Sequence, residues 1–195
     1  PDRANRRATL KALHGPCPLP TLAPMTIEIR RARVTDADFL PAIETCAAEL
    51  FRSDAQLAWL ADAAVADVPS HRANIQRHPV WVAVTADDIP CAFLNAEACD
   101  RELHVWEISV ARAHQGQGIG KRLLQAARQY ALEQQLEALT LSTFRELPWN
   151  EPFYQRQGFV TLEQAQLGPR LCQVLADEAR YGLPAARRCA MRLTL

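Results

Sequence analysis

The spacing of apolar side chains predicts strands at regular intervals along the chain. Residues 26–30 alternate apolar and polar side chains with a period of two, as a half-buried strand does. Residues 80–84 and 91–98 are mostly apolar and flank a short polar turn, so we expect them to form a hairpin. Residues 103–110 are apolar on both faces, which is typical of a central strand covered from both sides.

Stretches with helical spacing separate these strands. Thr35 provides a hydroxyl N-cap for a helix whose apolar positions recur every three or four residues through residues 39–51. Residues 55–77 predict two short helical pieces with a break near Pro69. The helix predicted over residues 119–131 keeps one apolar face, as an amphipathic helix packed on a sheet does.

The last third of the chain continues with strands and helices in an irregular order. Residues 138–143 and 159–162 predict strands, and a short helix over residues 150–157 lies between them. A helix near residues 170–180 and a final strand over residues 189–195 follow. The strands do not alternate regularly with helices, so the pattern predicts a mixed α/β sheet instead of repeated βαβ units.

The first 24 residues differ from the rest in composition. They carry four basic residues against one acid and five of the 13 prolines of the chain, without periodicity. This composition is typical of a flexible tail, which we expect over residues 1–24. An organelle-targeting segment and a basic arm that contacts a polyanion are alternative interpretations.

Composition and charge limit the class of protein. The chain has 195 residues, 49% of them hydrophobic, and 22 basic residues balance 22 acidic ones. This length suits one domain over residues 25–195. The balanced charge gives no reason to expect a nucleic-acid partner, and no apolar run reaches the ~18 residues of a transmembrane helix. We therefore expect a soluble, compact domain with no membrane partner.

The six cysteines are scattered along the chain. They form no C-x-x-C pair and have no histidine at ligand spacing, so we expect neither a zinc site nor any other metal. Several lie in apolar runs, as Cys91 and Cys189 do, where cysteine behaves as a small hydrophobic residue. We interpret all six as reduced thiols in a cytoplasmic protein.

A glycine-rich turn joins the strand that ends at Val110 to the following helix, and it reads Gln115-Gly116-Gln117-Gly118-Ile119-Gly120-Lys121. Glycines let the backbone approach a ligand closely, and the free N–H groups of a helix start bind anions. Lys121 and Arg122 would add positive charge where a diphosphate rests. The spacing fits neither a Walker loop nor a dinucleotide fingerprint. A connection that binds no ligand is the alternative.

The spacing Gln115-x-x-Gly118-x-Gly120 resembles the Q/R-x-x-G-x-G/A signature of the GNAT superfamily of N-acetyltransferases. Residues 150–159 resemble its second signature, in which Asn and Tyr on a short helix precede a Gly-Phe pair. The two motifs stand in the order of the family, and the resemblance extends over residues 25–195. It implies the GNAT fold, an α/β architecture with a mixed, mostly antiparallel central sheet of about seven strands and flanking helices.

The resemblance also implies that acetyl-CoA is the acyl donor and that the backbone amides of the turn hold its pyrophosphate. The backbone N–H of Val110 is then the donor to the oxyanion. The residues assigned to the cofactor are Ile108, Ser109, Val110, Gln115, Gly116, Gln117, Gly118, Ile119, Gly120, Lys121 and Asn150.

Glu107 and Tyr154 are the candidate catalytic side chains. Strand alternation places Glu107 on the face of Leu103 and Val105, and burial among apolar neighbours would make its carboxylate a better base. A structural carboxylate is an equally weighted alternative, and Glu97 and His104 are reserve candidates for the base.

Tyr154 matches the tyrosine of the family whose hydroxyl lies near the coenzyme sulfur, and a phenol can donate a proton to a thiolate. Asn150 lies one helical turn earlier, so both side chains can address one ligand. The alternatives are an amphipathic core role for Tyr154 and a plain helix N-cap for Asn150.

These observations predict an acetyl-CoA-dependent N-acetyltransferase that moves an acetyl group to a primary amine by direct attack. Its expected partners are acetyl-CoA, the amine and, as a possibility that the family allows, a second copy of the chain. Phe51 and Trp59 lie in the early helices, the region that shapes the acceptor pocket in this family. A catalytically silent module that binds or senses acyl-CoA is the first alternative, and a nucleotide-binding α/β protein is the second.

Overall fold

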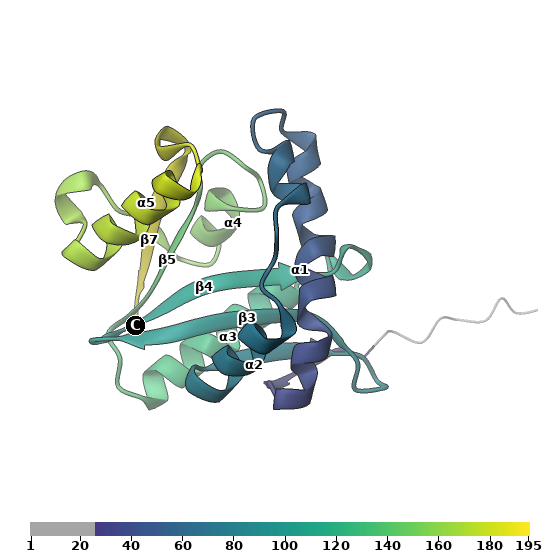
Figure 1. Ribbon diagram of the computed structural model, residues 1–195. Coiled ribbons are helices and arrows are strands. Elements are labelled where there is room, and N and C mark those ends of the chain that lie inside the picture. The colour runs from purple at the N-terminus through teal and green to yellow at the C-terminus, as the bar shows by residue number, and fades with distance from the viewer. Residues whose placement is uncertain (1–25) are drawn as a thin grey trace, which may run out of the picture.

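The computed structural model describes residues 26–195, and both the predicted tail over residues 1–24 and Cys17 lie outside the described residues. One sheet of seven strands in the order β1-β2-β3-β4-β5-β7-β6 forms its centre (Figure 1). The strands are β1 (Glu28–Arg31), β2 (Val80–Val84), β3 (Pro90–Cys99), β4 (Glu102–Val110), β5 (Ala138–Phe144), β6 (Val160–Thr161) and β7 (Arg188–Thr194). Only β4 and β5 pair in parallel, which confirms the predicted mixed, mostly antiparallel sheet.

Within residues 26–195, five α-helices flank the sheet, and short 3-10 turns lie in several of the connections. The helices are α1 (Leu40–Ala48), α2 (Val68–Arg77), α3 (Ile119–Glu133), α4 (Glu151–Gln155) and α5 (Pro169–Tyr181). Two of the 3-10 turns, η2 (Glu49–Ser53) and η3 (Ala58–Asp62), follow α1.

The predicted break near Pro69 is wrong, because Pro69 lies in the first turn of α2. Proline is tolerated there, since a first-turn N–H has no partner within the helix. Asp67 caps this start by accepting a hydrogen bond from the backbone N–H of Ser70 at 2.9 Å. The break therefore lies before Asp67, where the chain leaves η3.

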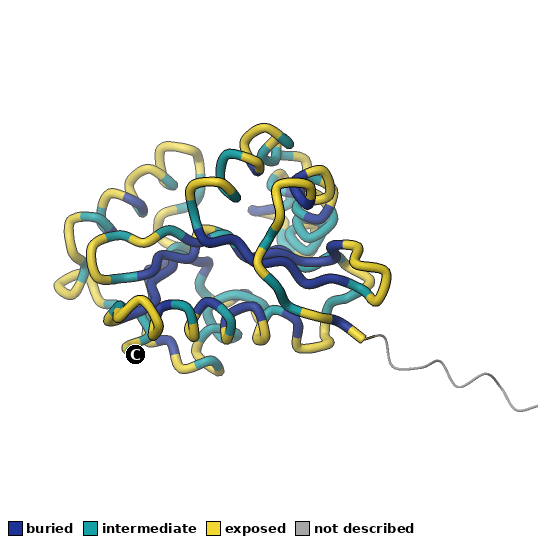
Figure 2. Tube along the Cα trace, turned by 90° about the horizontal axis from the view of Figure 1, so that it is seen from below, coloured by how far each residue is buried: buried dark blue, intermediate teal, exposed yellow. Residues whose placement is uncertain are grey.

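Alternate residues of the strands pack against different helices. Val82 and Val84 of β2 join a core cluster with Leu40 and Ile43 of α1, whereas Trp81 and Ala83 belong to the cluster that contains the apolar face of α3. The helices α1 and α3 thus cover opposite faces of the sheet (Figure 1). Figure 2 shows the strands as the buried layer between exposed helices and loops.

The helices α4 and α5 divide between the same two faces. Phe153 and Tyr154 of α4 pack against the α3 cluster. Glu178 of α5 accepts a hydrogen bond from Ser142, whose neighbours Leu141 and Leu139 point to the opposite face. The helix α5 therefore lies on the face of α1, and α4 lies on the face of α3.

A β-bulge in β4 overturns one prediction about Glu107. The register with β3 pairs Asn95 with Glu107 but Ala96 with Val105, so Trp106 is an extra residue. One extra residue reverses the alternation of side chains beyond it. Glu107 therefore lies on the α1 face, and the expectation that it shares a face with Val105 is wrong.

The strands β4 and β5 separate half-way along their length. Their pairing runs from Glu102 and Ala138 to Val105 and Leu141, and then stops. The strand β4 continues to Val110 and β5 to Phe144, so the last residues of β4 have a strand neighbour only on the β3 side. This separation opens a gap in the sheet, with the glycine turn at one end.

Two further predictions concern the chain as a whole. The five cysteines in the described part of the chain are all free, as the expectation of reduced thiols requires. Within residues 26–195, no helix has both the length and the apolar character that a membrane crossing needs.

Candidate active site

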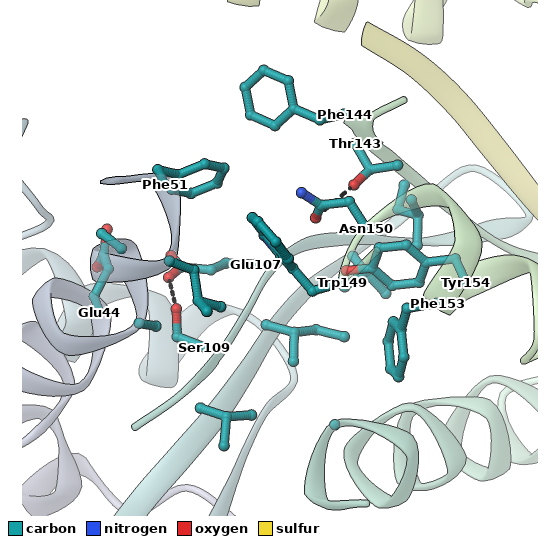
Figure 3. Close-up of a pocket in the computed structure, with 18 of the residues that line it drawn as sticks. Glu44, Phe51, Glu107, Ser109, Thr143, Phe144, Trp149, Asn150, Phe153 and Tyr154 are labelled. Atoms are coloured by element: carbon teal, nitrogen blue, oxygen red, sulfur yellow. Dashed lines mark hydrogen bonds between the residues drawn. The ribbon is translucent and has the colours of Figure 1, made fainter. Parts of the chain in front are cut away.

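A cavity of about 780 Å³ occupies the gap between β4 and β5 (Figure 3). Its walls include all but one of the predicted site residues. These are Glu107, Ile108, Ser109, Val110, Gln115, Gly116, Gly118, Ile119, Gly120, Lys121, Asn150 and Tyr154. The exception is Gln117, whose side chain turns back to the carbonyl oxygen of Ala113 at 3.2 Å.

The glycine turn has the backbone conformation that its sequence requires. Gly116 and Gly118 have φ values of 73° and 75°, in the left-handed region that glycine occupies without steric cost. A Cβ atom at either position would project into open space, with no atom within 4 Å. At Gly120 a Cβ would instead lie 3.4 Å from Phe153 of α4, so this glycine allows α3 and α4 to pack closely.

Six consecutive backbone N–H groups of this turn are free. The N–H groups of residues 116–121 make no hydrogen bond within the described part of the chain, whereas that of Arg122 donates to the carbonyl of Gly118 at 3.1 Å. Together with the positive end of the α3 dipole, such N–H groups form an anion site. Lys121 lies at this end of the cavity.

Arg122 does not add its charge there. Its guanidinium donates to the carbonyl oxygen of Ile27 at 2.8 Å and ties α3 to the segment before β1. The prediction that Arg122 faces the diphosphate is therefore wrong, because the next residue along a helix points about 100° away from Lys121.

The end of β4 presents backbone donors to the gap. The N–H of Ala111 donates to the carbonyl of Cys91 on β3 at 2.9 Å. Backbone groups of successive strand residues point to opposite edges, so the N–H groups of Val110 and Ile108 point away from β3 and into the gap. The side chain of Gln115 donates to the carbonyl of Val110 at 2.9 Å, which fixes the turn to the strand end.

Glu107 lies where a buried base is needed. Its carboxylate accepts a hydrogen bond from the hydroxyl of Ser109 at 2.6 Å. Burial, followed by the negative charge of Glu44, raises the pKa of Glu107 to about 8, although the Ser109 bond acts in the opposite direction. Ser109 was expected among the cofactor contacts, but its hydroxyl is directed to Glu107.

Glu44 of α1 is a second carboxylate in the cavity wall, and the sequence analysis missed it. Its Oε2 lies 3.3 Å from Nε2 of His71, a buried residue of α2. The only signal in the sequence was a single acid in an otherwise apolar helix. Its closeness to Glu107 depends on the packing of α1 against β4, which no local pattern reveals.

Tyr154 and Asn150 enter the cavity from α4. The ring of Tyr154 packs between Phe153 and Phe159, with ring centroids at 5.1 and 5.8 Å, and burial raises the pKa of its phenol. Its hydroxyl has no hydrogen-bond partner among the described residues. The Oδ1 of Asn150 accepts from Thr143 at 3.0 Å, while its buried Nδ2 has no partner in the same part of the chain.

The two reserve candidates for the base lie outside the cavity walls. Glu97 accepts a hydrogen bond from the indole of Trp106 at 2.9 Å. His104 is fully buried beside Thr140, and burial lowers its pKa to about 4. Glu107 is thus the one of the three candidates that the fold brings to Tyr154 and the glycine turn.

Comparison with known proteins places this geometry in a family. The sequence model of the acetyltransferase (GNAT) family matches residues 45–159, which is more than half of the chain. The chain belongs to the GNAT family. The match contains β4, the glycine turn and α4, and so covers both predicted motifs.

Solved GNAT structures share the fold of this GNAT protein at low sequence identity. The PaiA N-acetyltransferase of Thermoplasma acidophilum, in complex with coenzyme A, has a TM-score of 0.64 at 15% identity, with 88% of this chain and 100% of that chain covered. The ribosomal-protein-S18-alanine N-acetyltransferase of Escherichia coli has a TM-score of 0.61 at 16% identity, with 87% and 94% covered. At these identities the likeness establishes the fold.

The residues of this GNAT protein fit coenzyme A. The free N–H groups of residues 116–121 suit a diphosphate, the space at Gly116 and Gly118 leaves room for it, and the unpartnered amide of Asn150 can donate to the pantetheine arm. Within residues 26–195, no group of three or more His, Cys, Asp or Glu side chains could hold a metal ion.

Proposed function

We propose that this GNAT protein transfers an acetyl group from acetyl-CoA to a primary amine by direct attack, without a covalent enzyme intermediate. One observation carries the proposal. A single cavity brings an anion-binding turn, unpaired strand N–H groups, the buried carboxylate of Glu107 and the free hydroxyl of Tyr154 to the same gap in the sheet.

Each group has a distinct task in the transfer. Glu107 removes one proton from the ammonium group, and the amine nitrogen then bonds to the thioester carbon. The N–H of Val110 donates to the carbonyl oxygen as negative charge develops on it. The C–S bond breaks, Tyr154 gives its proton to the sulfur, and the second amine proton restores Tyr154. The products are an amide, free CoA thiol and one proton released from Glu107.

The glycine turn provides the test of this function. We expect Gly118→Ala to weaken acetyl-CoA binding by about 10 to 100-fold, because its methyl group would occupy the space for the diphosphate and cost a charge-assisted hydrogen bond of roughly 1.5–3 kcal/mol. Calorimetric titration with acetyl-CoA measures the binding. Thiol release with an amine should fall at low acetyl-CoA and recover at high acetyl-CoA.

Gly182→Ala is the matched control. Gly182 also has a positive φ, 106°, and open space around its Cβ position, but it does not line the cavity. It carries a similar backbone strain and should leave acetyl-CoA binding unchanged. Equal loss in both variants would refute the phosphate site. Binding without thiol release from any amine would instead favour a silent acyl-CoA-binding module.

Glu44→Gln is expected to shift the pH dependence of the reaction. The unprotonated form of Glu107 is the base, so activity rises with pH through its pKa of about 8. Removing the negative charge of Glu44 lowers this pKa, because a like charge nearby disfavours ionisation. The midpoint of the pH profile of kcat/KM should therefore move to lower pH by about one pH unit.

Glu49→Gln is the control for this charge change. Glu49 lies on η2 and pairs with Arg52 at 2.8 Å, outside the cavity walls. Its replacement should leave the midpoint in place. A midpoint that stays fixed in Glu44→Gln, or moves to higher pH, would show that Glu44 does not act on the base.

A further inference from the structure

The cavity has two halves, which belong to opposite faces of the sheet. The half on the side of α3 and α4 contains the glycine turn, Phe153 and Tyr154, and it is the cofactor site proposed above. The other half lies on the side of α1 and α5. We call it the acceptor half, and its walls include Glu44, Phe51, Leu60, Phe144, Trp149 and Arg188.

Aromatic rings dominate the acceptor half. The ring of Phe51 meets that of Phe144 edge-on at a centroid distance of 5.5 Å, and that of Trp149 at 6.5 Å. The three rings come from η2, the end of β5 and the loop before α4, and in Figure 3 Phe51 and Phe144 are drawn above Glu107 and Trp149 beside it. Such walls favour a flat apolar body, since ring edges and faces pack against one another.

The charges of the acceptor half leave a place for one cation. The guanidinium of Arg188 donates to both oxygens of Glu178 at 2.6 and 2.8 Å and lies 4.5 Å from the centre of the Phe144 ring. Its charge is therefore balanced, and it is not available to an anionic substrate. The carboxyls of Glu44 and Glu107 remain, both in the cavity wall and close enough for the charge of Glu44 to raise the pKa of Glu107.

Two contacts of residues outside the cavity walls fix the segment after α1. Asp54 pairs with Arg187, with N···O distances of 2.6 and 3.0 Å and about 20% of each side chain exposed. Leu57 is fully buried against Phe144 and Leu147. The segment after α1, which contributes Phe51 and Leu60 to the walls, is thus held onto the turn before β7, and a wall fixed in this way suits a compact molecule.

We propose that the acceptor is a compact primary monoamine with an aromatic body. Its ammonium group lies between Glu44 and Glu107, and its ring packs among Phe51, Phe144 and Trp149. This inference rests on the acetyl transfer proposed above and names the class of its acceptor. A carboxylate on the acceptor would meet the carboxyls of Glu44 and Glu107, and a second cation would find no further carboxyl among the described residues that line the cavity.

The test measures thiol release from acetyl-CoA by the unmodified protein with five amines of different chemistry. The set is 2-phenylethylamine, ethylamine without the ring, phenylalanine with a carboxylate, 1,4-diaminobutane with a second cation, and a short lysine peptide. We expect kcat/KM for 2-phenylethylamine to exceed that for ethylamine on the order of 10 to 100-fold, from burial of the ring. Phenylalanine and 1,4-diaminobutane should fall at least tenfold below it, by roughly the effect of one unpaired buried charge, and the lysine peptide should also fall below it because it is not compact.

Two results separate the failure of this inference from that of the proposed function. If one of the other amines matches or exceeds 2-phenylethylamine, the acceptor class is wrong while acetyl transfer stands. If acetyl-CoA binds in calorimetry but no amine in the set releases thiol above the rate of hydrolysis, the transfer itself is refuted, and the acceptor class with it.

The variant Phe51→Leu tests where the ring of the acceptor lies within the cavity. The variant should raise KM for 2-phenylethylamine about tenfold, while acetyl-CoA, which binds in the other half of the cavity, keeps its affinity. Phe39→Leu is the control, because Phe39 is 44% exposed and lies outside the cavity walls. An equal effect of both variants, or none in Phe51→Leu, would contradict the placement.

Discussion

Replacing Glu107 with Gln is expected to lower kcat/KM for the amine by about 10² to 10⁴-fold, the usual worth of a general base. Glutamine keeps the size of the side chain and can still accept the hydrogen bond from Ser109, but it cannot take a proton from the ammonium group. Thiol release at saturating acetyl-CoA measures the loss. Acetyl-CoA binding should stay unchanged, because the side chain of Glu107 lies on the α1 face of the sheet, whereas the glycine turn leads into α3 on the other face.

Glu97→Gln is the matched control for this loss. Glu97 lies on the neighbouring strand β3, outside the cavity walls, and accepts a hydrogen bond from the indole of Trp106. The amide oxygen of the glutamine in the variant can still accept that bond. The control should retain full activity. If Glu107→Gln is as active as the control, the proton leaves through water or another group, and the role assigned to Glu107 is wrong.

The same variant has a consequence for stability. The pKa of Glu107 rises from 4.5 in the unfolded chain to about 8 in the folded protein, so the folded state binds the proton more tightly. Its contribution to the free energy of unfolding is fully present below about pH 4.5 and is lost as pH rises to 8. Glutamine does not titrate, so Glu107→Gln does not lose this contribution. As pH rises from 4.5 to 8, the melting temperature of the variant should therefore increase relative to that of the wild type.

Local patterns were sufficient for the strands of the sheet and for the glycine turn. The glycine turn follows directly from Gly116 and Gly118, since positive φ values are rare for other residues, and the helix after it begins where the apolar spacing changes. The roles of Val110 and Ile108 depend on where β4 leaves β5. Their side chains carry no information on that point, and only the resemblance to the family indicated it.

The position of Glu107 shows where periodicity fails. The alternation along residues 103–110 predicts the strand correctly but places Glu107 on the wrong face of the sheet. The bulge at Trp106 inserts one extra residue, which moves each later side chain to the opposite face. Neither glycine nor proline marks this bulge. The prediction that burial raises the pKa of Glu107 still holds, but the neighbours that bury it come from α1 and the aromatic loops as well as from β4.

The acceptor half depends on contacts between distant segments, and for this reason the sequence could not reveal it. Arg187 and Asp54 are 133 residues apart, and Glu44 reaches Glu107 only because α1 packs across β4. Phe51 was placed in this region by the resemblance. Trp149 and Phe144 were not assigned to it, since an aromatic residue beside a strand end is equally typical of a core.

Replacing Tyr154 with Phe is expected to lower kcat by about 10²-fold and to leave the affinity for acetyl-CoA almost unchanged. The hydroxyl is the only atom lost, and the ring contacts with Phe153 and Phe159 persist. Burial raises the pKa of the phenol above its ordinary value of 10, so Tyr154 keeps its proton over the working range and can deliver it to the departing thiolate. The rate of thiol release at saturating acetyl-CoA and amine measures kcat.

The melting temperature distinguishes a catalytic role of the Tyr154 hydroxyl from a structural role. Because the hydroxyl of Tyr154 has no partner in the described part of the chain, its removal should not lower the melting temperature. Tyr130→Phe is the control. The ring of Tyr130 lies outside the cavity walls and packs on Trp81, with ring centroids 5.5 Å apart. Removal of the Tyr130 hydroxyl should change neither kcat nor the melting temperature. If Tyr154→Phe keeps the wild-type kcat, the thiolate leaves without a proton from Tyr154. A lower melting temperature together with a lower kcat would instead mean that the hydroxyl supports the fold.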